Sequence, residues 1–247
     1  MHTEYHKEYS PRLGRDMEFK VYGHGGKPVL VYPCQNGRFF DWEGFGMLDT
    51  LGDYLEGGKL QLFTADTIDG ETVSAKGQDP YGRVRRHEAW FGYITEELVP
   101  RIREINGTGQ DLLVTGFSMG AYHAGNTFFR RPDIFDSVIA LSGLYDTEDM
   151  YGGYMDEVVY ANSPVDYMAN LPADHPYIGL YNSQRAVICV GQGPWEIPDT
   201  TYQMKNILES KGIHTWVDVW GHDCAHDWPW WYKQVAYFLP WLLGQSD

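Results

Sequence analysis

The sequence predicts an α/β fold in which a mainly parallel central sheet carries helices on both faces. Three observations predict this architecture. Apolar, strand-like runs alternate with helix-like segments along the chain, which is the pattern of a parallel sheet with crossover helices. The length of 247 residues and the hydrophobic share of 43% suit one domain with a sizeable core. One apolar run also leads directly into a turn that carries a serine between two glycines. We therefore expect a single domain over residues 1–247.

The first half of the chain is expected to alternate between strands and helices in short steps. The expected strands are residues 17–22, 28–34, 60–65 and 111–117. The expected helices are residues 40–55, 81–105 and 121–129. The second of these helices has the clearest pattern, because Trp90, Ile94, Leu98 and Ile102 recur every four residues before Asn106-Gly107 ends the segment.

The second half continues the alternation after a less regular stretch. The expected strands are residues 137–142, 186–191 and 214–220, and the expected helices are residues 202–211 and 228–243. Residues 145–184, between the first two of these strands, are rich in Tyr, Asn, Pro and Gly. We expect this segment to form a small cap over the sheet edge, where loops often build binding pockets. An ordinary long connection with short helices is the alternative.

The serine between glycines has the pattern of a nucleophile elbow. The apolar run Leu112–Phe117 ends in Gly116-Phe117-Ser118-Met119-Gly120, and small residues follow. A sharp strand-to-helix turn strains the backbone at the serine and leaves room only for very small neighbours, which explains the two glycines. The amides at the start of the following helix point toward the oxygen that becomes negative during acyl transfer. This motif predicts an α/β-hydrolase fold with Ser118 as nucleophile.

The overall charge disfavours two classes of partner. The chain has 19 Lys and Arg residues against 34 Asp and Glu residues, so its formal net charge is −15. Nucleic acids and anionic membrane surfaces both require clustered positive charge. We therefore expect no nucleic-acid partner and no membrane association.

The cysteines and the N-terminal residues favour a protein of the cytoplasm. Cys34, Cys189 and Cys224 are odd in number and fit neither a zinc pattern nor a disulfide framework. Residues 1–7 are polar and lack the apolar core of a signal peptide, and no apolar run reaches transmembrane length. We expect a soluble, cytoplasmic chain.

The loop after the last expected strand, residues 221–228, offers two histidines. A serine hydroxyl needs a base to take its proton, and in this fold the base follows the last strand. We expect His226 to be this base, because it stands directly before the final helix, where its ring can be aimed at Ser118. His222 follows the strand end immediately and is expected to support the base. The i, i+4 spacing of the two histidines would suit a metal on a helix, but the flanking glycine and proline favour a loop, so no metal is expected.

The carboxylate that orients the histidine is expected after the strand at residues 186–191. Glu196 and Asp199 are both candidates, and we expect Glu196 because it is nearer the strand end. Asp146, which follows the preceding strand, is a third candidate. A cap on the following helix is the alternative role for Glu196.

The oxyanion hole requires two backbone N–H groups. One is expected from Met119, the residue after the nucleophile, and the other from the loop after the strand at residues 28–34. In that loop we expect Gln35 to donate, with Asn36 as its closest alternative, and no His-Gly-Gly-Gly element is present. Asn36 and Trp42 are expected to contact the substrate. A core position is the alternative for Trp42.

With these residues assigned, the chain resembles the "Putative esterase" family of α/β-hydrolases, which includes esterase D-like S-formylglutathione hydrolases, feruloyl esterases and mycolyltransferase antigens. The resemblance covers about residues 29–242 and rests on three segments: Gly116–Gly120, Ala140–Asp146 and His226–Trp231. The family pattern implies Ser118 as nucleophile and His226 as base. In members with a glutamate acid, that acid lies about thirty residues before the histidine, which matches Glu196 here (226 − 196 = 30).

These inferences predict a serine carboxylic-ester hydrolase that acts on a small-molecule ester through an acyl-enzyme on Ser118. Glu196 orients His226, and the reaction requires neither a metal nor an organic cofactor. Two alternatives remain open: an acyltransferase of the same fold, and a catalytically silent scaffold that binds a ligand or partner. The natural ester, its acyl chain length and the oligomeric state also remain open, and a homo-oligomer is compatible with the sequence.

Overall fold

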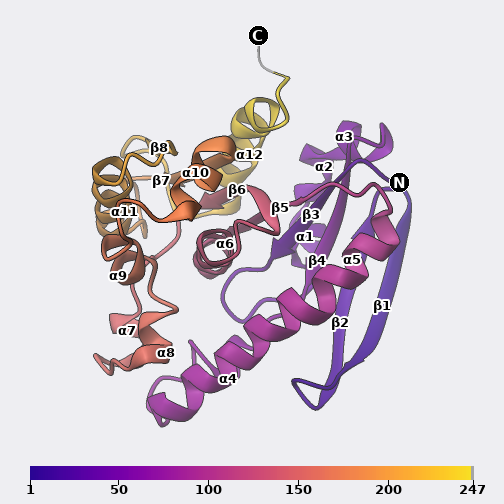
Figure 1. Ribbon diagram of the computed structural model, residues 1–247. Coiled ribbons are helices and arrows are strands. Elements are labelled where there is room, and N and C mark those ends of the chain that lie inside the picture. Colours follow the sequence, from indigo (N-terminus) through magenta and orange to yellow (C-terminus); the bar gives the residue numbers. More distant parts are fainter. Residues whose placement is uncertain (246–247) are drawn as a thin grey trace.

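The computed structural model describes residues 1–245, which form one eight-stranded sheet with helices on both faces (Figure 1). The strands are β1 (Thr3–Ser10), β2 (Arg15–Tyr22), β3 (Lys27–Tyr32), β4 (Leu60–Ala65), β5 (Leu112–Phe117), β6 (Phe135–Leu141), β7 (Arg185–Val190) and β8 (Trp216–Val219). They lie in the order β1-β2-β4-β3-β5-β6-β7-β8. The β1–β2 and β2–β4 pairs are antiparallel, and all the other pairs are parallel. The predicted fold class is confirmed.

Helices connect these strands and cover both faces. They are α1 (Asp41–Gly44), α2 (Met47–Thr50), α3 (Gly52–Glu56), α4 (Pro80–Tyr93), α5 (Val99–Asn106), α6 (Met119–Arg130), α7 (Glu148–Tyr151), α8 (Glu157–Tyr160), α9 (Pro164–Ala169), α10 (Pro176–Ser183), α11 (Asp199–Ser210) and α12 (Trp228–Leu242). A 3-10 turn, η1 (Asp69–Glu71), follows β4, and a π-helical turn, η2 (Ile94–Leu98), joins α4 to α5.

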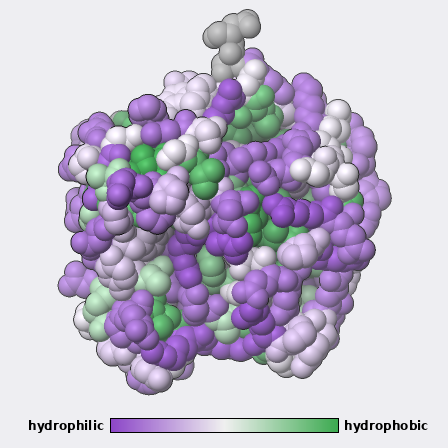
Figure 2. Space-filling model, viewed as in Figure 1, coloured by the Kyte–Doolittle hydropathy of each residue, from purple (hydrophilic) through white to green (hydrophobic). Residues whose placement is uncertain are grey.

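Two apolar cores sandwich the sheet. The first lies under α4, α5, α6 and α11 and contains Trp90 and Phe128. The second lies under α1–α3 and α12 and contains Leu55 and Phe238. Figure 1 shows α4, α5 and α6 in front of the strands. Because both faces are covered, the central strand β5 is buried along its whole length. On the outer surface seen in Figure 2, hydrophilic residues dominate and hydrophobic ones form small, separate patches.

Three segments differ from the sequence predictions. Strand β1 was not predicted, because its alternating residues are polar and only half-buried at best until Ser10; charged side chains of this kind protect the edge of a sheet. The helix predicted at residues 40–55 is split into α1, α2 and α3, and Gly46 at the first break has a left-handed φ of 80°. The helix predicted at residues 81–105 contains η2, which precedes Pro100, a residue without an amide hydrogen.

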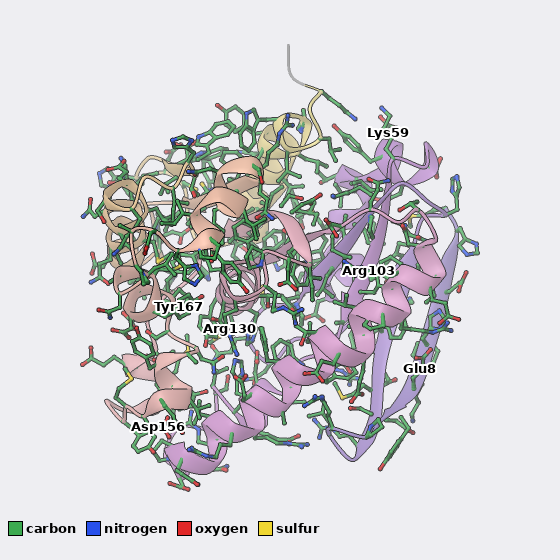
Figure 3. The ribbon with its side chains drawn as sticks, in the orientation of Figure 1. Glu8, Lys59, Arg103, Arg130, Asp156 and Tyr167 are labelled. Atoms are coloured by element: carbon green, nitrogen blue, oxygen red, sulfur yellow. The ribbon has the colours of Figure 1, made fainter. Side chains whose placement is uncertain are left out.

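Residues 145–184 form four short helices, α7–α10, that lie beside α4, α6 and α11 (Figure 1). An ion pair to α4 and a hydrogen bond from α6 fasten this segment to the rest of the fold. Asp156 accepts a hydrogen bond from Arg85 at 2.9 Å, and Arg130 contacts both Glu88 and Asn162 from one guanidinium; Figure 3 labels Asp156 and Arg130. The segment is therefore packed onto the body of the fold. Within residues 1–245, no helix is both long and apolar enough to cross a membrane.

Candidate active site

Ser118 occupies the turn between β5 and α6 with the strained geometry that the motif predicts. Its φ of 56° and ψ of −123° are unusual for a residue with a side chain. Its flanking glycines are required by space. A Cβ added to Gly116 would lie 2.4 Å from the carbonyl oxygen of Gly120, and one added to Gly120 would lie 2.5 Å from that of Pro33. No larger residue fits at either position, so the sequence fixes the sharp turn that exposes the serine.

A cavity of about 170 Å³ opens over Ser118. Its walls come from segments that follow the carboxyl ends of five parallel strands, which all lie at the same edge of the sheet. The lining residues are Gln35, Ser118, Met119, Tyr122, Ser142, Leu144, Met150, Trp195, Ile197 and His226. A larger, more open hollow of about 550 Å³ lies at the opposite edge beside Lys27 and Arg185, and it contains none of the candidate residues. The smaller cavity is therefore the candidate active site.

His226 and Glu196 form a pair at this cavity. The Nδ1 atom of His226 lies 3.2 Å from Oε2 of Glu196; the imidazole is 25% exposed and the carboxylate 1% exposed. Their two loops are interlocked, because the His226 N–H donates to the Pro194 carbonyl at 3.0 Å and the Gly193 N–H donates to the Cys224 carbonyl at 2.8 Å. The pairing has the geometry in which a buried carboxylate orients an imidazole.

A serine and a tryptophan that the sequence analysis did not assign hold the second oxygen of Glu196. The Ser142 hydroxyl donates to Oε1 of Glu196 at 2.7 Å, and Nε1 of Trp231 donates to the Ser142 hydroxyl at 3.0 Å. The Trp231 ring also stands edge-on to His226, with ring centroids 5.2 Å apart. Ser142 has a φ of 61°, a conformation rare for serine. The Ala140–Asp146 segment of the family resemblance contains Ser142, and that was the signal available in the sequence.

Ser118 and His226 line the same cavity, and no direct hydrogen bond joins their side chains. The hydrogen bond between a nucleophile and its base can be long before a substrate binds and tighten when it does. The remaining candidates lie elsewhere. His222 is exposed, with Nδ1 3.3 Å from the Gln192 carbonyl oxygen. Asp199 is exposed at the start of α11, and Asp146 is half-buried, where burial raises the pKa of its carboxyl group.

The residues of both expected oxyanion donors line the cavity. Met119 is the first residue of α6, and Gln35 follows β3. Among residues 1–245, no acceptor lies within hydrogen-bonding distance of either backbone N–H group. Unused N–H groups beside a candidate nucleophile can bind an oxygen that becomes negative. The side chain of Gln35 also lines the cavity, and its amide donates to the Ser74 hydroxyl at 2.8 Å.

Trp42 does not line the cavity and takes the core position that the sequence analysis gave as its alternative. Its indole is 3% exposed and stacks on Phe117, with ring centroids 4.7 Å apart, in the core beneath the cavity floor. Asn36 does not line the cavity either: its φ is 56°, its backbone N–H donates to Asp69, and it lines a separate surface hollow. Local sequence does not reveal to which side of a loop these residues turn.

The three cysteines do not line the cavity. Cys34, Cys189 and Cys224 are free thiols, and burial raises the pKa of the Cys34 thiol to about 12, so it is protonated at neutral pH. In the part of the chain that the structure describes, no group of three or more His, Cys, Asp or Glu side chains has the arrangement of a metal site.

Comparison with known proteins places this geometry in a family. The family model described as "Putative esterase" matches residues 10–242. A ferulic acid esterase has a similar structure, with a TM-score of 0.78 and 17% identity over 99% of each chain. An S-formylglutathione hydrolase from Staphylococcus aureus has a TM-score of 0.71 and 14% identity, over 98% of this chain and 97% of that one.

A second S-formylglutathione hydrolase, from Agrobacterium tumefaciens, has a TM-score of 0.73 and 16% identity, over 99% of this chain and 95% of that one. No curated protein sequence matches the chain significantly. At such low identities the structural likeness shows the fold, and the family model, which spans most of the chain, shows the family. The chain therefore belongs to the "Putative esterase" family: it has the α/β-hydrolase fold and is a serine esterase.

Proposed function

We propose that this esterase hydrolyses small-molecule carboxylic esters through an acyl-enzyme on Ser118, with His226 as base and Glu196 as the carboxylate that orients it. One observation carries the proposal: the Glu196–His226 pair opens onto the same cavity as Ser118. The strained turn at Ser118 and the unused N–H groups of Met119 and Gln35 support it.

The first half of the proposed reaction transfers the acyl group to the enzyme. The Ser118 hydroxyl attacks the ester carbonyl carbon while Nε2 of His226 takes its proton. The charged imidazole donates from Nδ1 to Glu196, which stabilises it. The tetrahedral oxyanion accepts hydrogen bonds from the N–H groups of Met119 and Gln35. The carbon–oxygen bond to the alcohol then breaks, and His226 returns the proton to the leaving alcohol.

The second half releases the acid. His226 takes a proton from water, which attacks the acyl carbon, and the proton then returns to Ser118 as the acyl bond breaks. All proton transfers use one imidazole, so the chain needs no cofactor for this chemistry.

The walls of the cavity favour a short, apolar acyl group. Tyr122, Leu144, Met150 and Ile197 present apolar surface around Ser118, and the volume of about 170 Å³ is small. Met150 comes from residues 145–184, so we propose that this segment acts as a small cap on a single catalytic domain. A long acyl chain would have to displace the cap or extend past Trp195 into solvent.

The direct test is hydrolysis of p-nitrophenyl acetate and butyrate by wild type, Ser118→Ala and His226→Ala. Both halves of the proposed reaction require the Ser118 hydroxyl and the His226 imidazole, so kcat should fall by at least about 10³-fold in each variant. His222→Ala is the matched control, because this histidine lies in the same loop and contacts only a backbone carbonyl, and it should retain most of the activity.

Other outcomes would contradict the proposal. Full activity in Ser118→Ala would exclude the acyl-enzyme on Ser118. A well-folded wild type with neither turnover nor fluorophosphonate labelling would favour a silent binding scaffold. Transfer of most acyl groups to an added alcohol, rather than to water, would identify an acyltransferase.

A further inference from the structure

A second histidine–carboxylate pair lies behind the cavity. Nε2 of His123 is 2.9 Å from Oδ1 of Asp69, and the two side chains are 1% and 2% exposed. His123 lies one turn into α6, the helix that begins after Ser118, and Asp69 begins η1. Neither residue lines the cavity. Burying these polar groups costs free energy unless they are well paired. The presence of two of them in the core therefore calls for a structural or functional explanation.

Asp69 also holds the loop that carries Gln35. Its second oxygen, Oδ2, accepts a hydrogen bond at 3.3 Å from the backbone N–H of Asn36, the residue next to Gln35. Asn36 has a left-handed φ of 56°, a strained conformation for a residue with a side chain. The loop therefore depends on contacts such as this one to keep its shape.

A second connection runs from the same turn to Gln35 itself. The Ser74 N–H donates to the backbone carbonyl of Asp69 at 2.9 Å, and the Ser74 hydroxyl accepts from the side-chain amide of Gln35 at 2.8 Å. Asp69 is thus linked to the loop of Gln35 twice: directly through its carboxylate, and indirectly through Ser74, which bonds its backbone carbonyl.

His123 is the side chain that pairs with the Asp69 carboxylate, and the nearby side chains of His87 and Arg83 do not compete with it. His87 packs against His123 with ring centroids 5.5 Å apart, and burial lowers the pKa of His87 to about 3, so this ring is neutral near pH 7. The buried guanidinium of Arg83 donates to three backbone carbonyls, those of Thr72, Val73 and Met150.

We infer that His123 and Asp69 are positioning residues of the esterase, which together set the separation between the two oxyanion donors. One donor, Met119, is on the helix of His123, and the other, Gln35, is on the loop that Asp69 holds. The inference rests on the proposed function. Misplacing a catalytic group by about 1 Å costs about 100-fold in rate, so a rigid link between the segments that carry these two donors has a direct catalytic value.

This role makes a prediction that a merely structural pair does not. The oxyanion forms only on the way through the transition state, so loosening its donors lowers kcat and leaves KM nearly unchanged. A purely structural pair would lower the melting temperature and the number of folded molecules, while each folded molecule would keep its turnover.

The experiment compares His123→Phe, which removes the hydrogen bond, with His123→Gln, whose amide N–H can still donate to Asp69. Thr127→Val is the matched control: Thr127 lies one turn further along α6, is 1% exposed, and bonds Tyr32 in the core. The turnover number for p-nitrophenyl acetate is divided by the concentration of active sites titrated with fluorophosphonate, so that unfolded molecules do not lower the measured kcat.

We expect His123→Phe to lower kcat by about tenfold to 100-fold with KM within about twofold of wild type. His123→Gln should recover most of this loss, and Thr127→Val should lose stability but keep its kcat. If His123→Phe does not fold, Asp69→Asn replaces it, with a kcat loss of about tenfold expected.

An unchanged kcat in the variant that folds, or an equal loss in Thr127→Val, would overturn the inference. Ser118→Ala, measured in parallel, separates the two hypotheses. If it keeps wild-type turnover, the proposed function fails. If it is inactive while His123→Phe and Asp69→Asn both keep wild-type kcat, only the positioning role fails.

Discussion

Two histidine–carboxylate pairs in this molecule have similar geometry and opposite surroundings. The His226–Glu196 pair is 3.2 Å apart and the His123–Asp69 pair is 2.9 Å apart. The imidazole of His226 is 25% exposed and lines the cavity, whereas that of His123 is 1% exposed. The comparison shows that access to a substrate, rather than the pairing itself, distinguishes a ring that can transfer protons from one that can only hold position.

The rings around the two histidines reinforce this difference. His226 meets the edge of Trp231 on one side and the cavity on the other. His123 is enclosed by aromatic side chains, with ring centroids at 4.7 to 5.7 Å from its own. These are Tyr32, His87, Trp90 and Tyr122. A proton released by His123 would have no acceptor on a substrate.

The sharpest test of the comparison exchanges each carboxylate for its amide. Glu196→Gln should lower kcat by about 10⁴-fold, because the amide neither stabilises the imidazolium nor fixes the correct tautomer. Asp69→Asn should lower it only by about tenfold, because it loosens donors without removing them. Steady-state kinetics on p-nitrophenyl acetate measure both. Similar losses in the two variants would mean that the pairs are not functionally distinct.

A smaller effect is expected where Glu196 receives its second hydrogen bond. Ser142→Ala removes the donor to Oε1, and a hydrogen bond to a charged group contributes about 1.5–3 kcal/mol, so kcat should fall by about tenfold or somewhat more. Ser137→Ala is the matched control, since this serine is buried on β6, the strand that ends directly before Ser142, and its hydroxyl donates to Asp136. If the two variants lose equal activity, Ser142 does not support the acid.

The smallest expected effect is on the pH dependence of stability, and it comes from His87, which packs against the buried His123. Burial lowers the pKa of His87 from 6.5 to about 3. Between these two pH values the imidazole of His87 is protonated in the unfolded chain and neutral in the folded chain. Stability from this residue is complete above pH 6.5 and is lost as the pH falls toward 3, by up to about 1.4 kcal/mol per pH unit. His87→Phe should flatten that part of the curve of melting temperature against pH. An unchanged slope would contradict the burial argument.

The parts of the site that the sequence predicts are those encoded by local patterns. The turn at Ser118 needs glycines at fixed offsets, and apolar runs mark the strands whose carboxyl ends gather the loops. The same reasoning selected Glu196 and His226, which follow β7 and β8, and the structure brings the two side chains together.

The parts that escaped prediction depend on tertiary packing. His123 and Asp69 are far apart in the chain, and each alone has no distinctive pattern, so their pairing appears only in the fold. Trp42 could have faced either the core or the cavity, and Phe117 decides for the core. Strand β1 has a polar sequence because it lies at the sheet edge, which hides it from a search for apolar runs.

The loop that supplies Glu196 also carries Trp195, whose indole is 88% exposed at the rim of the cavity. All the other tryptophans of the chain are buried or half-buried. Iodide should therefore quench this ring more strongly than any other tryptophan, and a molecule that enters the cavity should reduce that quenching. The esterase thus carries an intrinsic optical reporter beside its candidate acid, and ligands can be ranked by quenching protection before any natural substrate is known.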